Sequence, residues 1–154
     1  MKNVILIGLG TALLTGIFIG AQATLSGRLG GIIGPIRTGL MMNVMGGILA
    51  FVVYVITLVL PIVKEEGTIT PRAITMLFFG GLLGVFIVVG VSFSISRVGV
   101  TAGLGTIILG QMLVSSIVDA SGWGGVEPIP LTTTRIAGLA VMGFAVFLLL
   151  PKTT

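Results

Sequence analysis

Residues 73–95 read AITMLFFGGLLGVFIVVGVSFSI, a stretch without a single charged side chain. An α-helix rises about 1.5 Å per residue, and about 20 apolar residues cross the hydrocarbon core of a bilayer, so this stretch is long enough to span it. A second apolar stretch occupies residues 99–118, and only Ser96, Arg97 and Val98 separate the two. The pair therefore predicts two membrane-spanning helices that form a tight antiparallel hairpin.

Three further apolar stretches flank this hairpin, at residues 4–25, 38–60 and 134–150. The segments between them contain glycines, prolines and charged side chains, which weaken helices or require water and lipid headgroups. The last stretch is short, and Thr132, Thr133 or Thr134 is expected to cap its helix. The sequence thus predicts a single all-α transmembrane domain over residues 1–154, with five helices and the lipid bilayer as its solvent.

The composition excludes most other classes of protein. Hydrophobic residues make up 55% of the 154 residues, charged residues only 8%, and the mean hydropathy is +1.26. A soluble domain needs roughly 25% charged residues to cover its surface. The chain has no Cys and no His, which argues against disulfides and against ordinary zinc or haem sites. No catalytic or phosphate-binding motif is present, so we expect no enzyme, no cofactor and no nucleic-acid partner.

The N-terminal stretch has a second interpretation. Lys2, an apolar run and Ala21-Gln22-Ala23 resemble a signal peptide with its cleavage site. The apolar run is longer than such a signal needs, and further membrane spans follow it. We therefore expect this segment to be retained as the first helix.

The basic residues are evenly divided between the two sides of the membrane. If five helices cross, four Lys or Arg fall on the side of the N-terminus and four on the other (Lys2, Lys64, Arg72 and Arg135 against Arg28, Arg37, Arg97 and Lys152). An excess of Lys and Arg normally fixes the orientation of a membrane protein. Either a small bias escapes this count, or the chain inserts in both orientations and pairs as an antiparallel homodimer of ten helices. Such a pair is equivalent to the inverted repeats of secondary transporters.

Small residues recur every fourth position, which favours close helix packing. The clearest row is Gly8, Ala12, Gly16, Gly20 and Thr24 in the first helix. In the fourth helix one i, i+4 face holds small and polar residues, Gly99, Gly103, Gln111, Ser115 and Asp119, with Ile107 as its only large member. Close packing within one chain accounts for most of these positions. A cavity or a partner subunit is the alternative, and it fits the first and fourth helices best.

Polar side chains within the spans are the candidates for substrate binding, because each needs a partner or a water-filled cavity in hydrocarbon. Gln111 lies near the middle of the fourth helix, where it is either a substrate contact or a structural residue. Asp119 is either a helix-end carboxylate or a cation or proton site. No acid lies deep in any span, so an obvious proton relay is absent. The full candidate set is Gln22, Asn43, Ser92, Gln111, Ser115 and Asp119.

Several segments resemble the YdcZ-like inner-membrane proteins of the drug/metabolite transporter superfamily. These are Gly20–Gly30 with Gly34-Pro35, Gly80–Gly84, Arg97-Val98-Gly99, Gly110–Leu113, Ser116–Asp119 and Thr134–Gly138. The resemblance implies a five-helix half-transporter that works as an antiparallel pair or beside a homologous subunit. It also implies that Gln22, Gln111 and Asp119 correspond to recurring polar positions of the family. Ser26 departs from the family pattern, which tends to have Asn there, and the first helix lacks the glutamate of the small multidrug exporters.

These observations predict a multi-pass inner-membrane transporter subunit for a small metabolite or organic compound, operating by alternating access. A passive dual-topology ion channel and a non-transporting membrane subunit are the alternatives. Neither the substrate nor the coupling ion follows from the sequence.

Overall fold

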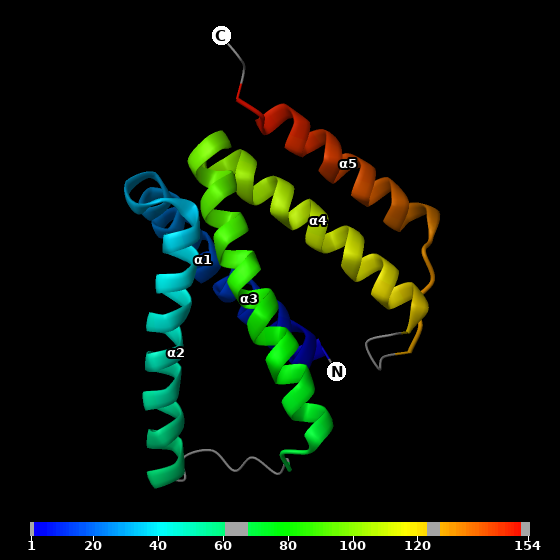
Figure 1. Cartoon of the computed structure of the whole chain (residues 1–154). Coiled ribbons are helices and arrows are strands. Elements are labelled where there is room, and N and C mark those ends of the chain that lie inside the picture. Colours follow the sequence, from blue (N-terminus) through cyan, green and yellow to red (C-terminus); the bar gives the residue numbers. More distant parts are fainter. Residues whose placement is uncertain (1, 61–67, 123–126, 152–154) are drawn as a thin grey trace. The chain divides into compact units, whose positions relative to one another are not determined.

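The computed structural model describes residues 2–60, 68–122 and 127–151 (Figure 1). These residues form helices and no strand, which confirms the all-α prediction: α1 (Lys2–Ile33), α2 (Pro35–Val59), α3 (Pro71–Val98), α4 (Val100–Ser121) and α5 (Thr133–Leu149). In length and composition α1 to α4 suit membrane spans, whereas α5 is apolar but shorter, at 17 residues. Lys64 and the side chains of Lys2 and Lys152, three of the eight basic residues counted above, lie outside the described residues.

The chain divides into two compact units. The terminal unit comprises Met1–Thr24 and Ser94–Thr154, and the central unit comprises Leu25–Phe93. Helices α1 and α3 each contribute to both units, while α2 belongs to the central unit and α4 and α5 belong to the terminal unit.

Helix α1 is longer than the sequence predicts. Its helical conformation continues through residues 26–33, which we expected to form a loop, and ends only at Ile33. Glycine weakens a helix by only about 1 kcal/mol relative to alanine, and close packing can offset that cost. Ser26, Gly27 and Gly30 are all buried, so the small residues of this segment let other helices approach it. The helix breaks at Gly34, which has a φ of 89°, a conformation that glycine adopts readily and other residues rarely adopt. Pro35 then begins α2.

The central unit is held together where α3 contacts α1 and α2. The buried Ser92 hydroxyl donates a hydrogen bond to the Ser26 carbonyl oxygen, 2.9 Å away, and Ser92 also lies against Gly30. Gly39 of α2 lies directly on the backbone of Val89, where even a methyl group would not fit. In Figure 1, α2 and α3 run in opposite directions and converge at this end. The small residues Gly30, Gly39 and Ser92 therefore serve, in this unit, as contacts between helices of one chain.

Replacing Gly34 by alanine is expected to destabilise the central unit. The conformation at Gly34 (φ 89°, ψ 149°) costs an L-residue about 1–3 kcal/mol, and no neighbouring atom lies near enough to add a steric clash. Gly31→Ala is the matched control, because Gly31 lies in the last turn of α1 with open space around it, and alanine has a higher helix propensity than glycine. Unfolding in detergent, followed by circular dichroism, should rank Gly34→Ala below wild type and Gly31→Ala at or above it. Equal stability of the two variants would contradict this account.

The terminal unit contains a helical hairpin of α4 and α5. The two helices run side by side in opposite directions (Figure 1), and glycines lie at some of their contacts. Gly105 lies near Val146 and Leu149, and Gly143 lies near Leu109. Of the three threonines proposed to cap α5, the structure selects Thr132, whose hydroxyl oxygen accepts a hydrogen bond from the Arg135 N–H.

The link between α3 and α4 is as short as predicted. Gly99 alone separates them, with a φ of 85°, and its N–H donates to the Ile95 carbonyl oxygen. Gly103 then lies close to Ile95, so the first turn of α4 packs on the last turns of α3. Helix α3 is longer than predicted by two residues at its start and three at its end, where the backbone stays helical through Arg97 up to this glycine.

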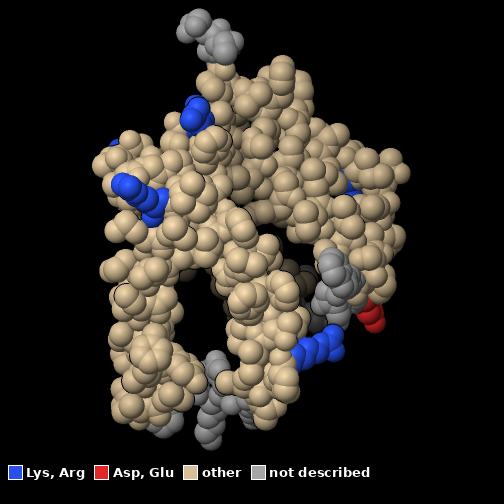
Figure 2. Space-filling view, viewed as in Figure 1, with Lys and Arg blue, Asp and Glu red and all other residues tan. Residues whose placement is uncertain are grey.

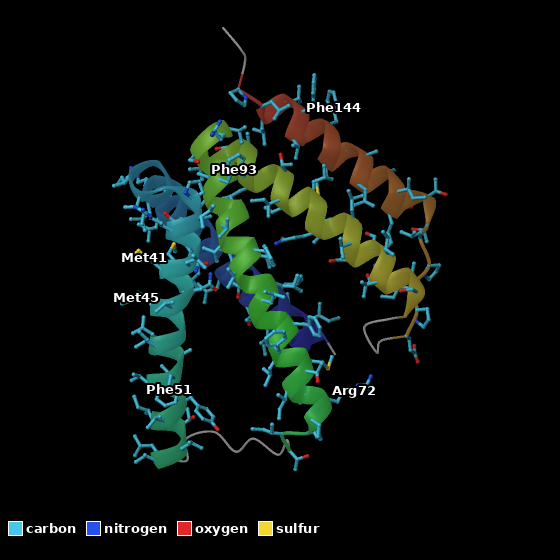
Figure 3. The ribbon with its side chains drawn as sticks, in the orientation of Figure 1. Met41, Met45, Phe51, Arg72, Phe93 and Phe144 are labelled. Carbon is cyan, nitrogen blue, oxygen red and sulfur yellow. The ribbon has the colours of Figure 1, made fainter. Side chains whose placement is uncertain are left out.

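The molecular surface is almost entirely apolar. Figure 2 shows one face on which only a few scattered side chains are acidic or basic. Large apolar side chains are exposed along every helix; Met41 and Met45, for example, lie on the side of α2 away from α3 (Figure 3). Such a surface suits hydrocarbon rather than water, which agrees with the membrane-spanning character of the helices.

Candidate functional site

A charged pair lies where the α4–α5 hairpin turns. The Nη2 of Arg135 lies 3.2 Å from the Oδ2 of Asp119 and donates a hydrogen bond to it, and about a third of each side chain is exposed. The Nη1 of Arg135 is buried and has no hydrogen-bond partner among the described residues. The Nη2 half of the guanidinium fork is thus paired with Asp119, and the Nη1 half has no acceptor among the described residues.

The local backbone explains why these two residues meet. Helix α4 ends at Gly122, which has left-handed geometry (φ 66°). The returning chain is tied back to α4 by the N–H of Ile129, which donates to the Asp119 carbonyl oxygen at 2.9 Å. Thr132 then starts α5, which places Arg135 in its first turn opposite Asp119.

The two charges are oriented unfavourably for their own helices. Asp119 is in the last turn of α4, where the helix end carries partial negative charge, and Arg135 is in the first turn of α5, where that charge is positive. Each placement costs about 0.3–1 kcal/mol at an exposed helix end. A pair with the signs exchanged would serve the fold better. Helix stability therefore does not explain why Asp119 and Arg135 occupy these positions.

The pair forms one end of a groove between α4 and α5. The groove has a volume of about 450 Å³ and is lined by side chains of both helices: Met112, Ser115, Ser116, Asp119, Arg135, Gly138, Leu139 and Met142. The Ser116 hydroxyl is engaged with the Met112 carbonyl oxygen of its own helix. Figure 3 places Phe144 on the side of α5 that faces away from α4, so this bulky residue leaves the groove clear. The site combines one positive and one negative group with a flexible apolar wall.

Two of the six candidate residues from the sequence share this groove, Ser115 and Asp119. Gln111 belongs to the same i, i+4 row of α4, one turn before Ser115, and is exposed. The row predicted on the fourth helix therefore leads from Gln111 into the groove.

The other three candidates lie elsewhere. Gln22 is an exposed residue of α1 in the terminal unit. In the central unit, the side-chain amide of Asn43 donates to the Gly39 carbonyl oxygen of its own helix at 2.8 Å. Ser92 is fully buried in the contact with Ser26 described above. Substrate contact by these three residues stays a prediction.

Sequence reasoning overlooked Arg135 as a site residue, because it counted this arginine only as a helix-end anchor. A signal was present in the sequence. Asp119 and Arg135 stand at the two ends of the segment between the fourth and fifth helices, and a hairpin brings the ends of such a segment together. Ser26 and Thr38 were also missed as buried residues; the structure leaves their hydroxyl oxygens without a hydrogen-bond partner among the described residues. Within the same residues, no three His, Cys, Asp or Glu side chains gather as metal ligands would.

Comparison with known proteins gives one family match. The family model described as "Putative inner membrane exporter, YdcZ" matches residues 7–148, which include all five helices in whole or in large part. No curated protein and no solved structure matches the chain. The resemblance seen in the sequence is thereby confirmed, and with it the location of a multi-pass protein in the inner membrane.

Proposed function

Because this chain belongs to the YdcZ family of putative inner membrane exporters, a family of membrane proteins rather than enzymes, we propose that it is a subunit of a secondary transporter. The subunit moves a small metabolite or organic compound out of the cell by alternating access. It performs no enzymatic step and uses no cofactor.

The observation that supports this role best is the groove between α4 and α5. In a chain with only 8% charged residues, two opposite charges meet at one end of a groove of about 450 Å³, within the volume range of small-molecule sites. Charged groups are rare and costly in an apolar membrane protein, so a pair that closes one end of a groove, at the ends of α4 and α5, is a candidate for substrate contact. Asp119 and Arg135 are the residues that we propose to contact the substrate first, with Ser115 and Gln111 deeper along α4.

The transporter is proposed to be an antiparallel homodimer. Two inverted copies would form a ten-helix unit related by a two-fold axis in the membrane plane, the arrangement of inverted repeats on which many secondary transporters are built. The even division of Lys and Arg, four against four, supports insertion in both orientations. Pairing with a homologous subunit instead is one outcome of the test below.

Labelling of single cysteines is expected to find both orientations in one membrane. The chain has no cysteine, so Ile36→Cys, next to the α1–α2 turn, and Glu127→Cys, between α4 and α5, are clean reporters on opposite sides. In right-side-out vesicles, a membrane-impermeant maleimide should label about half of each variant, because the basic residues do not select a side. Complete labelling of one reporter and none of the other would show a single orientation and overturn the homodimer.

A biased variant provides the control for this experiment. Glu127→Lys together with Ile129→Lys raises the basic residues on the N-terminal side from four to six, against four on the other side. In this background Ile36→Cys should become almost fully labelled from outside. If both orientations are required, the biased variant alone should lose export, and co-expression with an oppositely biased variant should restore it.

Transport itself is tested with purified protein in liposomes. A transporter predicts saturable uptake and exchange of substrate across the vesicle membrane, measured with radiolabelled amino acids, amines and organic acids. Fast, unsaturable ion flux would instead identify a channel, and no flux of any kind from correctly folded protein would identify a non-transporting subunit.

A further inference from the structure

The charges of the groove balance, and this balance limits what the groove can bind. Asp119 and Arg135 are the acidic and basic residues among those that line it, so its formal charge is −1 plus +1, or zero. When no ligand is present, each group is the partner of the other. The site therefore contains no unpaired charge in its unliganded form.

A ligand with a single charge would disturb this balance. An anion that took both nitrogens of the Arg135 fork would leave the charge of Asp119 without its partner, and a cation that displaced Arg135 from Asp119 would do the same to Arg135. Leaving one charge without its partner is unfavourable, although solvent lowers the cost because about a third of each side chain is exposed. A ligand that carries both charges replaces the contact between Asp119 and Arg135 with two new contacts and keeps the sum at zero.

The geometry of Arg135 favours a carboxylate in particular. Its Nη2 donates to Asp119 while its buried Nη1 has no partner among the described residues, so the guanidinium uses half of its fork. Guanidinium groups bind carboxylates best with two parallel N–H···O bonds. A ligand carboxylate would use both nitrogens, while an ammonium group close to that carboxylate would take over the oxygen atoms of Asp119.

Apart from Ser115 and Ser116, the remainder of the groove is apolar. Met112, Leu139 and Met142 form its wall beyond the charged pair, and Gly138 leaves space between them. Methionine side chains are flexible and adapt to apolar groups of different shapes. This wall fits a branched or linear hydrocarbon side chain of a few carbon atoms.

From these observations we propose that the groove binds a zwitterion of the α-amino acid type with an apolar side chain. The carboxylate pairs with Arg135, the ammonium group pairs with Asp119, and the side chain lies against Met112, Leu139 and Met142. The proposal rests on the transporter function proposed above, for which it names the substrate class. Binding opens the contact between Asp119 and Arg135, and release allows the contact to form again.

Three probes with the same hydrocarbon tail test the charge requirement. Leucine carries both charges, 4-methylpentanoate lacks the ammonium group, and 3-methylbutylamine lacks the carboxylate. Displacement of tritiated leucine from purified protein at pH 7 should require at least tenfold more of either single-charge probe than of leucine. Equal displacement by all three probes, or no leucine binding, overturns the proposal.

Two variants extend the test. Each is expected to gain a preference for one of the single-charge probes, a change that a folding defect would not produce. Asp119→Asn leaves Arg135 unpaired, so binding should shift at least tenfold from leucine toward 4-methylpentanoate. Arg135→Gln should shift it toward 3-methylbutylamine. Thr75→Ala is the control, because Thr75 lies in the central unit and its exposed hydroxyl bonds only the Pro71 carbonyl oxygen of its own helix. Loss of leucine binding in both variants without the opposite shifts would show that the pair is structural.

Liposome transport separates failure of this proposal from failure of the transporter function. If the protein exchanges amines or organic acids but not leucine, the zwitterion proposal is wrong and the function stands. If it transports none of the three classes while folded, the transporter function fails with it.

Discussion

Gly39→Leu is expected to prevent the packing of α2 on α3 and to unfold the central unit. A Cβ atom at this position would lie 2.8 Å from the backbone nitrogen and 2.9 Å from the Cα of Val89, and it would overlap the Val89 side chain. Backbone atoms inside a helix cannot move aside as a flexible side chain can. Inserting a bulky residue into a packed contact costs about 1–3 kcal/mol and occasionally more, and a clash with backbone atoms places Gly39→Leu at the upper end.

Two measurements check this expectation. Purified Gly39→Leu protein should aggregate on size-exclusion chromatography, or unfold at a much lower denaturant concentration than wild type. Gly46→Leu is the control on the same helix, since no atom lies within 4 Å of a Cβ built at Gly46, and it should fold normally. If Gly39→Leu were as stable as Gly46→Leu, the close contact of α2 with α3 would not exist in the membrane.

Reversing one charge of the α4–α5 pair should reduce export by about 10- to 100-fold. Asp119→Arg places two cations at one end of the groove. Breaking a charged pair costs about 2–5 kcal/mol when it is desolvated, and solvent screening lowers this figure because a third of each side chain is exposed. A remaining cost of about 1.4–2.8 kcal/mol corresponds to the expected 10- to 100-fold reduction in export. Initial rates of export from liposomes measure it.

The double exchange, Asp119→Arg with Arg135→Asp, distinguishes a binding role from a structural one. The exchanged signs match the partial charges of both helix ends, so the protein should unfold at an equal or higher denaturant concentration than wild type. The groove, however, would then accept a substrate only in the reverse orientation, with its apolar part away from Met112 and Met142. Export should therefore stay at least tenfold below wild type. Full recovery of export would show that the pair merely holds the hairpin together.

The helices could be predicted from the sequence because long apolar stretches mark them. Uninterrupted apolar stretches are physically required of a membrane helix, and each predicted stretch corresponds to one of the five helices. The turn at Gly99 was also predictable, since only three residues separate two spans. Family membership followed from ordered motifs that extend over nearly the whole chain.

The C-terminal part of α1 was not predictable, because the sequence shows the local cost of glycine and not the packing that offsets it. The segment Ser26–Ile33 looks like a loop until Ser92 is placed against Ser26 and Gly30. The candidate site shows the same limit. Helix periodicity found the row that contains Gln111, Ser115 and Asp119, but the partner Arg135 comes from another helix and depends on how the hairpin closes. Contacts between distant residues require tertiary structure.

The unequal lengths of α1 and α5 have a consequence for the lipids around the protein. At about 1.5 Å per residue, the 32 residues of α1 extend about 48 Å, and the 17 residues of α5 about 25 Å. The hydrocarbon core is about 30 Å thick, so α1 must tilt or project from it, whereas α5 draws the lipid surfaces together around itself. No single bilayer thickness relieves both mismatches. The acyl-chain length of the surrounding lipids thus acts directly on the hairpin that carries Asp119 and Arg135.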